Sequence, residues 1–244
     1  GDLEKRMLTD KSIKESKIKK LREDAAKLME PENTANEAYR EAIRKFIRAG
    51  WPTDPQGDFY KVDRPLTTYQ FFIPRMSADE APAAFKVSNL VKPRRWIIVY
   101  RGAFTAPETG RFRFVGLCDD ILVVSLKNKL VLDGSLAQLT NEWPRESIGK
   151  AWAHHNSSPS LHAGSWFQLE AGQTYPLNVL IGEQPGGVFY AYLLIEKSGE
   201  KYDSRAQNSG KLLPVFQLAP TNMPRGYEVE NTAPAVPKQQ FICQ

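Results

Sequence analysis

The stretch GRFRFVGLCDDILVVSLKNKLVLD, residues 110–133, decides the fold of this chain. At its start Phe112 and Phe114 alternate with arginines, which is the pattern of a strand with one buried face. Two further apolar runs follow, residues 121–127 and 130–132, with an asparagine turn between them. The stretch therefore predicts three short strands in succession.

The same pattern of short apolar runs continues on both sides of this stretch. Turn residues, mostly proline and glycine, separate the runs. Several short strands at this spacing predict an antiparallel β-sandwich over residues 95–197, so the fold class is mainly β. The further predicted strands are residues 96–105, 167–170, 174–182 and 188–196.

Residues 2–30 predict a helix with a thin apolar stripe, and charged residues fill its other faces. A stripe this thin does not stabilise a lone helix in water, so we expect it to have a partner. Pro31 is predicted to end this helix, because proline removes a backbone donor and clashes with the preceding turn. The stripe consists of Ile18, Leu21, Ala25 and Leu28.

Residues 34–49 predict a second helix with a broader apolar face. Thr34 and Glu37 have the spacing of a capping box, and Gly50 follows the last turn as a C-terminal cap. Together the two segments predict a helical hairpin or arm over residues 1–50, through which a protein partner can dock. The apolar face includes Tyr39, Ile43 and Phe46.

The remaining segments surround the predicted sandwich. Residues 51–94 are irregular and rich in proline and aromatic residues, with one candidate strand at 69–73. A long segment with this apolar content is expected to pack on the sandwich. Residues 136–166 form an insert between predicted strands, and residues 198–244 predict an extended, proline-rich tail.

The charge of the chain does not indicate a nucleic-acid partner. The formal net charge is +5 and the sequence pI is about 9.1. Residues 1–30 carry nine Lys or Arg against seven Asp or Glu, a net of +2, and no aromatic residue interleaves with the lysines. No apolar run reaches the ~20 residues that span a bilayer. We therefore expect no nucleic-acid partner, and membrane association only through an anchor outside this sequence.

The two cysteines leave the redox compartment open. Cys118 and Cys243 lie far apart, and their spacing does not decide whether they are paired or free. Cys118 lies in an apolar strand, which indicates a small buried side chain.

The sequence does not assemble a catalytic or zinc site. All three histidines, His154, His155 and His162, lie in the insert, and adjacent histidines point to opposite sides of an extended chain. Surface loop histidines are therefore favoured over a zinc site. The sequence has no Ser-His-Asp elbow, phosphate-binding glycine loop or Cys-His arrangement, so we expect no enzyme.

Several motifs together resemble one known family. They are Tyr100-Arg-Gly102, Pro107–Gly110, the alternating run from Gly110, Asp119-Asp120, and residues 123–126, 131–133 and 169–177. In combination they resemble the protective-antigen (PA-fourteen) domains, which are β-sandwich modules of protective antigen, of flocculin-type adhesins and of proteins with attached glycosidases. The resemblance covers residues 95–197, and residues 51–94 resemble an extension seen in bacterial members.

The resemblance implies a calcium site at the loop end of the sandwich. In the sugar-binding members a pair of aspartates, joined by a cis peptide, faces one Ca²⁺ that also coordinates sugar hydroxyls. The matching pair here is Asp119-Asp120, and Glu183 stands where the adhesins place an asparagine on a second loop. Calcium prefers several oxygen ligands, which these carboxylates begin to supply. The alternative is that the aspartates only cap a strand end by accepting hydrogen bonds from nearby backbone amides.

The tryptophans of the insert are a second candidate for ligand binding. Trp143 and Trp152 combine apolar area with a polar edge, and Trp166 does the same. The alternative is that these rings cover the end of the sandwich, because large rings are mostly buried.

The resemblance also implies a function and a location. It implies a non-catalytic, extracytoplasmic binding or adhesion module, at the cell surface or in the periplasm. The implied partner is a glycan or a cell-surface polymer, bound with calcium. Export or anchoring would come from a segment not present in this sequence. The alternative is a structural or protein-interaction module, a spacer with docking helices, that has no metal or glycan site.

Overall fold

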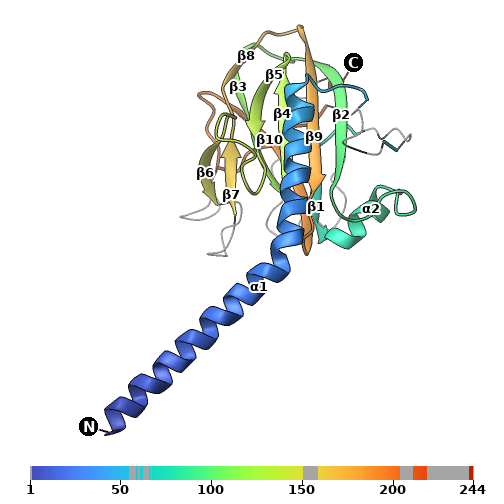
Figure 1. Cartoon of the computed structure of the whole chain (residues 1–244). Helices are drawn as coiled ribbons and strands as arrows, with labels where there is room; N and C mark the ends of the chain where they lie inside the picture. The colour runs from blue at the N-terminus through green and yellow to red at the C-terminus, as the bar shows by residue number, and fades with distance from the viewer. Residues whose placement is uncertain are drawn as a thin grey trace. The chain divides into compact units, whose positions relative to one another are not determined.

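The computed structural model describes residues 2–54, 59, 61–62, 66, 68–150, 159–203, 211–218 and 242–243. The chain divides into two compact units, residues 1–52 and residues 53–244. The first unit contains one helix, and the second is a β-sandwich (Figure 1).

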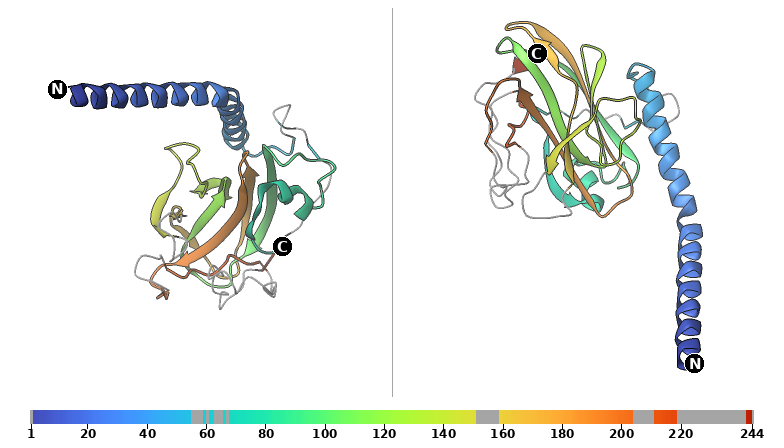
Figure 2. Two further views of the ribbon diagram at one scale, coloured as in Figure 1. Left: turned by 90° about the horizontal axis from the view of Figure 1, so that it is seen from below. Right: turned by 90° about the vertical axis from the view of Figure 1, so that its left-hand side faces the viewer.

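The first unit is a single helix, the arm of the two arrangements, hairpin or arm, that the sequence predicts. Helix α1 runs from Asp2 to Arg48 with Pro31 inside it, so the prediction that Pro31 ends a helix is wrong. A proline removes only one helical hydrogen bond and bends the axis, and α1 changes direction along its length (Figure 2). The predicted capping box is also absent, because the Thr34 hydroxyl donates to the Glu30 carbonyl oxygen at 2.9 Å.

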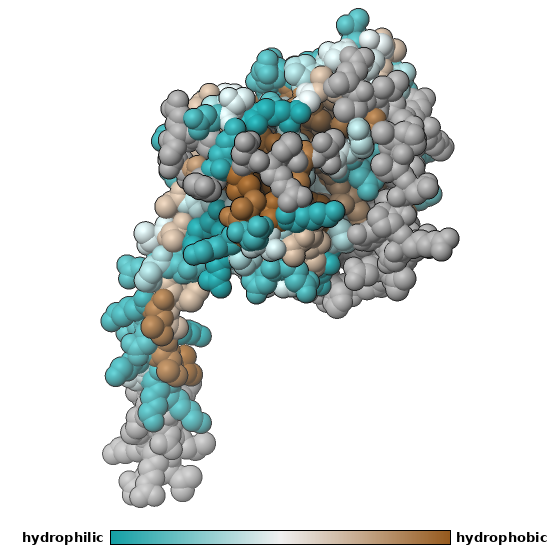
Figure 3. Space-filling view, turned by 90° about the vertical axis from the view of Figure 1, so that its right-hand side faces the viewer, coloured by the Kyte–Doolittle hydropathy of each residue, from teal (hydrophilic) through white to brown (hydrophobic). Residues whose placement is uncertain are grey.

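The two halves of α1 differ in exposure. The C-terminal half has the predicted buried face, which includes Tyr39, Ile43 and Phe46. Phe46 packs edge-to-face on Trp51, with ring centroids 6.0 Å apart. In the N-terminal half, apolar side chains stand out on a polar surface (Figure 3). These exposed residues are Ile18, Leu21, Leu28 and Met29. Among the described helices, none is both long enough and apolar enough to cross a membrane.

The second unit is built from two antiparallel sheets, which confirms the predicted fold class. One sheet has the order β1-β10-β3-β7-β6, and β8 also pairs with β3. The other has the order β11-β2-β9-β4-β5. The strands of the first sheet are β1 (Phe72–Ser77), β3 (Gly110–Asp119), β6 (Glu146–Lys150), β7 (Ser160–Ala163), β8 (Phe167–Leu169) and β10 (Val188–Lys197). Those of the second are β2 (Trp96–Thr105), β4 (Ile121–Leu126), β5 (Lys129–Asp133), β9 (Thr174–Glu183) and β11 (Ile242–Cys243).

Segments outside the predicted strands also take part in the sandwich. Residues 51–94 contribute β1, which begins three residues after the start of the candidate strand. The short helices η1 (Ala78–Glu80) and α2 (Ala81–Ala84) follow it. The insert contributes β6 and β7. Within the predicted extended tail, Leu213, Val215 and Phe216 do not lie along the surface but are buried.

Strand β10 is buried on both faces. Phe189 and Leu193 face the core between the sheets, whereas Tyr190 and Tyr192 face a second apolar cluster on the outer side of their sheet. The same alternation in β3 places Cys118 in the core between the sheets, where it is buried as the sequence predicts and is a free thiol.

Candidate functional site

The ends of β3 and β9, one strand from each sheet, bring the three predicted acidic residues to one end of the sandwich. Asp119 is the last residue of β3, Asp120 follows it, and Glu183 is the last residue of β9. The peptide between Asp119 and Asp120 is cis. Since β4 pairs with β9 from the first residue of β4, the turn before β4 lies beside the end of β9. The backbone N–H of Gln184 donates to Asp120 Oδ2 at 2.7 Å, which joins the two loops directly.

The Glu183 side chain is buried without a hydrogen-bond partner. It continues the inward-facing series of Val179 and Ile181 on β9, and it is 0% exposed. Neither of its carboxylate oxygens has a hydrogen-bond partner among the described residues. The backbone of the loop that follows lies close to it, since a Cβ atom at Gly186 would lie 3.5 Å from Glu183 Oε1.

Burial and neighbouring acidic groups keep the Glu183 carboxyl protonated at neutral pH. Burial raises its pKa most, and the charges of Asp120, Asp119 and Asp79 raise it further, to about 9. A buried carboxylate without a hydrogen bond or counter-charge is costly, so the proton neutralises it. A bound cation at this position would provide the missing counter-charge.

Asp119 lies in a more polar environment. Burial raises the pKa of Asp119, while a hydrogen bond with Asp120 and the charge of Arg75 lower it in part. Both aspartates are partly exposed. The backbone carbonyl of Asp120 accepts from the N–H of Leu136 at 2.7 Å, which fixes the start of the insert beside the site.

The donor set is suitable for a hard cation. Asp119, Asp120 and Glu183 supply only oxygen atoms, which calcium prefers, and Glu183 has two free acceptor atoms. In the part of the chain that the structure describes, no three acidic, His or Cys side chains already meet in metal-binding geometry. Binding a cation there therefore requires the side chains to close on it.

The tryptophan platform of the insert stays a prediction. Trp143 lies half-buried in the turn before β6. Trp152 lies outside the described residues. Trp166 packs on the guanidinium groups of Arg111 and Arg113, whose Cζ atoms lie 5.3 and 4.6 Å from its ring centroid.

His162 is buried on β7, so the prediction of a surface loop histidine is wrong for this residue. Its Nε2 lies 2.6 Å from Nη2 of Arg145, which also donates to the carbonyls of Ser135 and Leu136. Burial, and then the charge of Arg145, lower the pKa of His162 to about 4. His154 and His155 lie outside the described residues.

His162→Gln is expected to flatten the loss of stability in acid. The folded state keeps His162 neutral down to about pH 4, whereas the unfolded state binds a proton near pH 6.5. The unfolded state therefore binds more protons between these values, and stability falls as the pH drops through this window. The contribution is about 1–3 kcal/mol. Urea unfolding at pH 4.5 and 7 measures it, and an equal pH dependence in both proteins would contradict the assignment.

Sequence patterns do not reveal three residues that border the site. Arg75 and Asp79 belong to β1 and η1, and Tyr190 pairs with Asp119 across β10 and β3. No motif marks Arg75 or Asp79, because the segment that carries them has no clear periodicity. Only the pairing of β1 with β10 places them at this end of the sandwich.

No protein-family model and no curated protein sequence matches the chain. The chain is similar to a solved PA14 sugar-binding domain from an RTX adhesin, with 13% identity and a TM-score of 0.36 over 58% of this chain and 75% of that one. It is also similar to the PA14 domain of the MpAFP antifreeze protein, with 13% identity and a TM-score of 0.36 over 60% and 71%. The A domain of Epithelial Adhesin 6 from Candida glabrata, in complex with Galb1-3GlcNAc, gives 15% identity and a TM-score of 0.28 over 49% and 50%. The first two are domains of the family that residues 95–197 resemble. With TM-scores this low, no site residue is transferred from them.

Proposed function

We propose that this chain is a non-catalytic binding module that holds Ca²⁺ with Asp119, Asp120 and Glu183 and uses the ion to bind a glycan of a cell-surface polymer. The observation that carries the proposal is the Glu183 carboxyl, which is fully buried with two unpartnered oxygens beside two aspartates. The glycan is the ligand that the sequence resemblance implies.

The chemistry of the three side chains supports a calcium ion. Calcium takes six to eight oxygen ligands, and a cation at this point would replace the proton that keeps Glu183 neutral. Asp119 and Asp120 are partly exposed at the end of β3, so side-chain rotation can bring them to the ion without movement of the sheet. The remaining positions are open to water and to neighbouring hydroxyl groups of a sugar.

The proposed location follows from the expected strength of the site. Calcium sites of extracellular modules have dissociation constants of about 10⁻⁴–10⁻³ M. Three carboxyl groups, one of which must lose a proton, suit this weak range. We therefore propose an extracytoplasmic module, in the periplasm or at the cell surface, where a weak site can be filled.

Calcium is expected to raise the melting temperature of the chain. A ligand that binds only the folded state stabilises it by mass action, which at ten to a hundred times the dissociation constant amounts to about 1.4–2.7 kcal/mol. For a unit of this size that energy corresponds to a shift of about 3–11 °C. Thermal melts and calorimetry in 10 mM CaCl₂, with MgCl₂ for comparison, measure it.

Substitutions identify the site that is responsible. The double change Asp119→Asn with Asp120→Asn is expected to abolish the calcium shift and leave the sandwich folded, and Glu183→Gln to reduce it. Glu170→Gln serves as the matched control, because Glu170 is exposed and lies just before the opposite end of β9. A glycan array with calcium and with chelator then tests the ligand.

The absence of both heat and thermal shift would remove the calcium-dependent proposal. The aspartates would then only cap the ends of strands. Asp120 already accepts such a bond from the backbone N–H of Gln184. The chain would stand as a structural or protein-interaction module. The exposed Ile18, Leu21 and Leu28 of α1 favour that second candidate.

A further inference from the structure

Three neighbouring strands align a short row of side chains on the outer face of one sheet. Tyr190 of β10 pairs with Asp119 of β3. On the other side of β10, Ile73 pairs with Ala191 and Met76 with Phe189, so the register shifts between these pairs. The shift leaves Pro74 and Arg75 opposite Tyr190, as in a β-bulge. A bulge on an edge strand changes the direction in which a side chain points.

The alternation of the strands places Tyr190 and Asp119 on the same face. Phe189 and Ala191 belong to the core between the sheets, and so does Cys118, so Tyr190 and Asp119 point to the outer side. Ile73 and Met76 of β1 pack against the core between the sheets, and Arg75 between them is exposed, so Arg75 points to the outer side. Its charge opposes the rise in pKa of Asp119 and of Tyr190, which agrees with this placement.

The N–H donors of the Arg75 guanidinium are available to a ligand. Its side chain is exposed, and it forms no hydrogen bond or ion pair with the part of the chain that the structure describes. A guanidinium carries five N–H donors in a planar fork that matches a carboxylate, and such paired bonds are both strong and geometrically specific. Of the three acidic residues of the candidate site, Asp119 is the one on which the Arg75 charge acts.

We propose that Arg75 binds the carboxylate of an acidic sugar, so that the ligand of this module is a uronic-acid polymer. This inference rests on the proposed function and names the ligand class of that site. An acidic sugar would be repelled by the aspartates alone. The calcium ion neutralises the aspartates on one side of the site, and Arg75 attracts an anion on the other side. The hydroxyl groups of the sugar would then lie toward Asp119, and its carboxylate would bind the guanidinium of Arg75.

Arg75→Gln tests the assignment with defined polymers. In calcium buffer, wild-type protein is expected to bind polygalacturonate or alginate at least tenfold more tightly than neutral dextran or galactan. Arg75→Gln is expected to lose about ten- to a hundredfold in affinity for the acidic polymers, the range of one charge-assisted paired contact. Arg75→Lys should recover only part of the loss, because an ammonium group lacks the fork. The calcium shift in melting temperature should not decrease, because the substitution removes a positive charge beside the ion.

The matched control is Arg111→Gln. Arg111 is exposed and lies at the opposite end of β3, so this change removes the same charge away from the site. Equal affinity of wild type for acidic and neutral polymers, or equal affinity of Arg75→Gln and Arg111→Gln for the acidic ones, would overturn the Arg75 assignment. If the calcium shift persists in that case, only this inference fails. A wild-type chain without a calcium shift overturns the proposed function, and one that also binds no polymer overturns both.

Discussion

Phe216→Ala is expected to lower the free energy of unfolding by about 3–5 kcal/mol, the usual range for truncating a buried phenylalanine. Phe216 is fully buried between the two sheets. Its ring packs on Phe114 and Phe104, with centroids 5.0 and 5.5 Å apart, and stacks on Phe71 at 6.5 Å. The backbone N–H of Phe216 also donates to the Leu193 carbonyl at 2.9 Å, so the whole segment is fixed on β10.

The measurement is urea unfolding followed by tryptophan fluorescence. Phe216→Leu is expected to lose less, because most of the buried volume remains. Tyr69→Ala serves as the control, since Tyr69 is 46% exposed and its truncation leaves no cavity in the core. A Phe216→Ala protein that unfolds at the wild-type urea concentration would show that residues 211–218 do not belong to the core.

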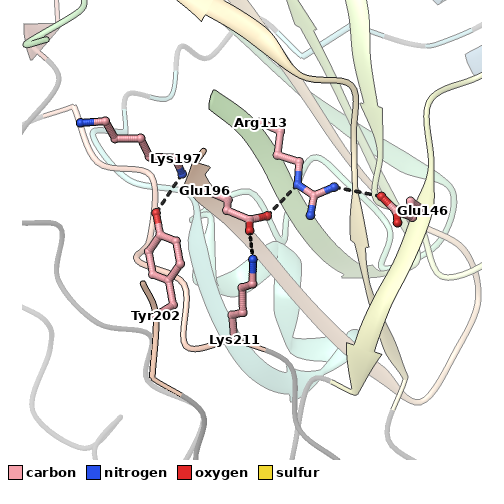
Figure 4. Close-up of polar contacts among 6 residues, drawn as sticks. All are labelled: Arg113, Glu146, Glu196, Lys197, Tyr202 and Lys211. Atoms are coloured by element: carbon pink, nitrogen blue, oxygen red, sulfur yellow. Dashed lines mark hydrogen bonds and ion pairs between the residues drawn. The ribbon is translucent and has the colours of Figure 1, made fainter. Parts of the chain in front are cut away.

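Arg113→Met is expected to lower stability by about 3–5 kcal/mol, because it leaves a buried carboxylate with an incomplete set of partners. Glu196 on β10 is only 2% exposed and accepts from Nε of Arg113 at 2.6 Å (Figure 4). Lys211, which is half exposed, forms the other ion pair of Glu196. Lys211 alone does not replace the buried hydrogen bond that the guanidinium donates to Glu196.

Two further variants separate the buried pair from its exposed neighbour. Arg113 also bonds Glu146 at 2.9 Å, but the Glu146 side chain is 68% exposed. Glu146→Gln should therefore change stability by less than about 1 kcal/mol, as is usual for surface ion pairs. The double change Arg113→Met with Glu196→Leu should recover most of the loss, because the charges that lose a partner, Lys211 and Glu146, are exposed to water and no buried charge remains unpaired. Equal effects of Arg113→Met and Glu146→Gln in chemical unfolding would contradict the role given to Glu196.

The sequence determined the strands that form the centre of the sandwich. The predicted strand at 96–105 coincides with β2, and those at 121–127, 174–182 and 188–196 differ from β4, β9 and β10 by one residue at the end. The predicted strand at 130–132 is one residue shorter than β5 at each end. Alternation within a strand is a local property, so it can be recognised without the partner strand. The family resemblance also pointed to Asp119, Asp120 and Glu183, and the structure places these residues at one end of the sandwich.

Only the tertiary structure decided the features that depend on distant segments. Whether Pro31 ends a helix or bends it depends on the bonds of the surrounding turns, and α1 continues through it. Phe216 and His162 are buried because other strands cover them. The proline-rich tail and the insert that carry these residues have no periodic apolar pattern from which this burial could be predicted. Arg75 reaches the outer face beside Asp119 because β1 pairs with β10 and bulges opposite Tyr190. Pairing register joins residues more than forty positions apart, and no local pattern encodes it.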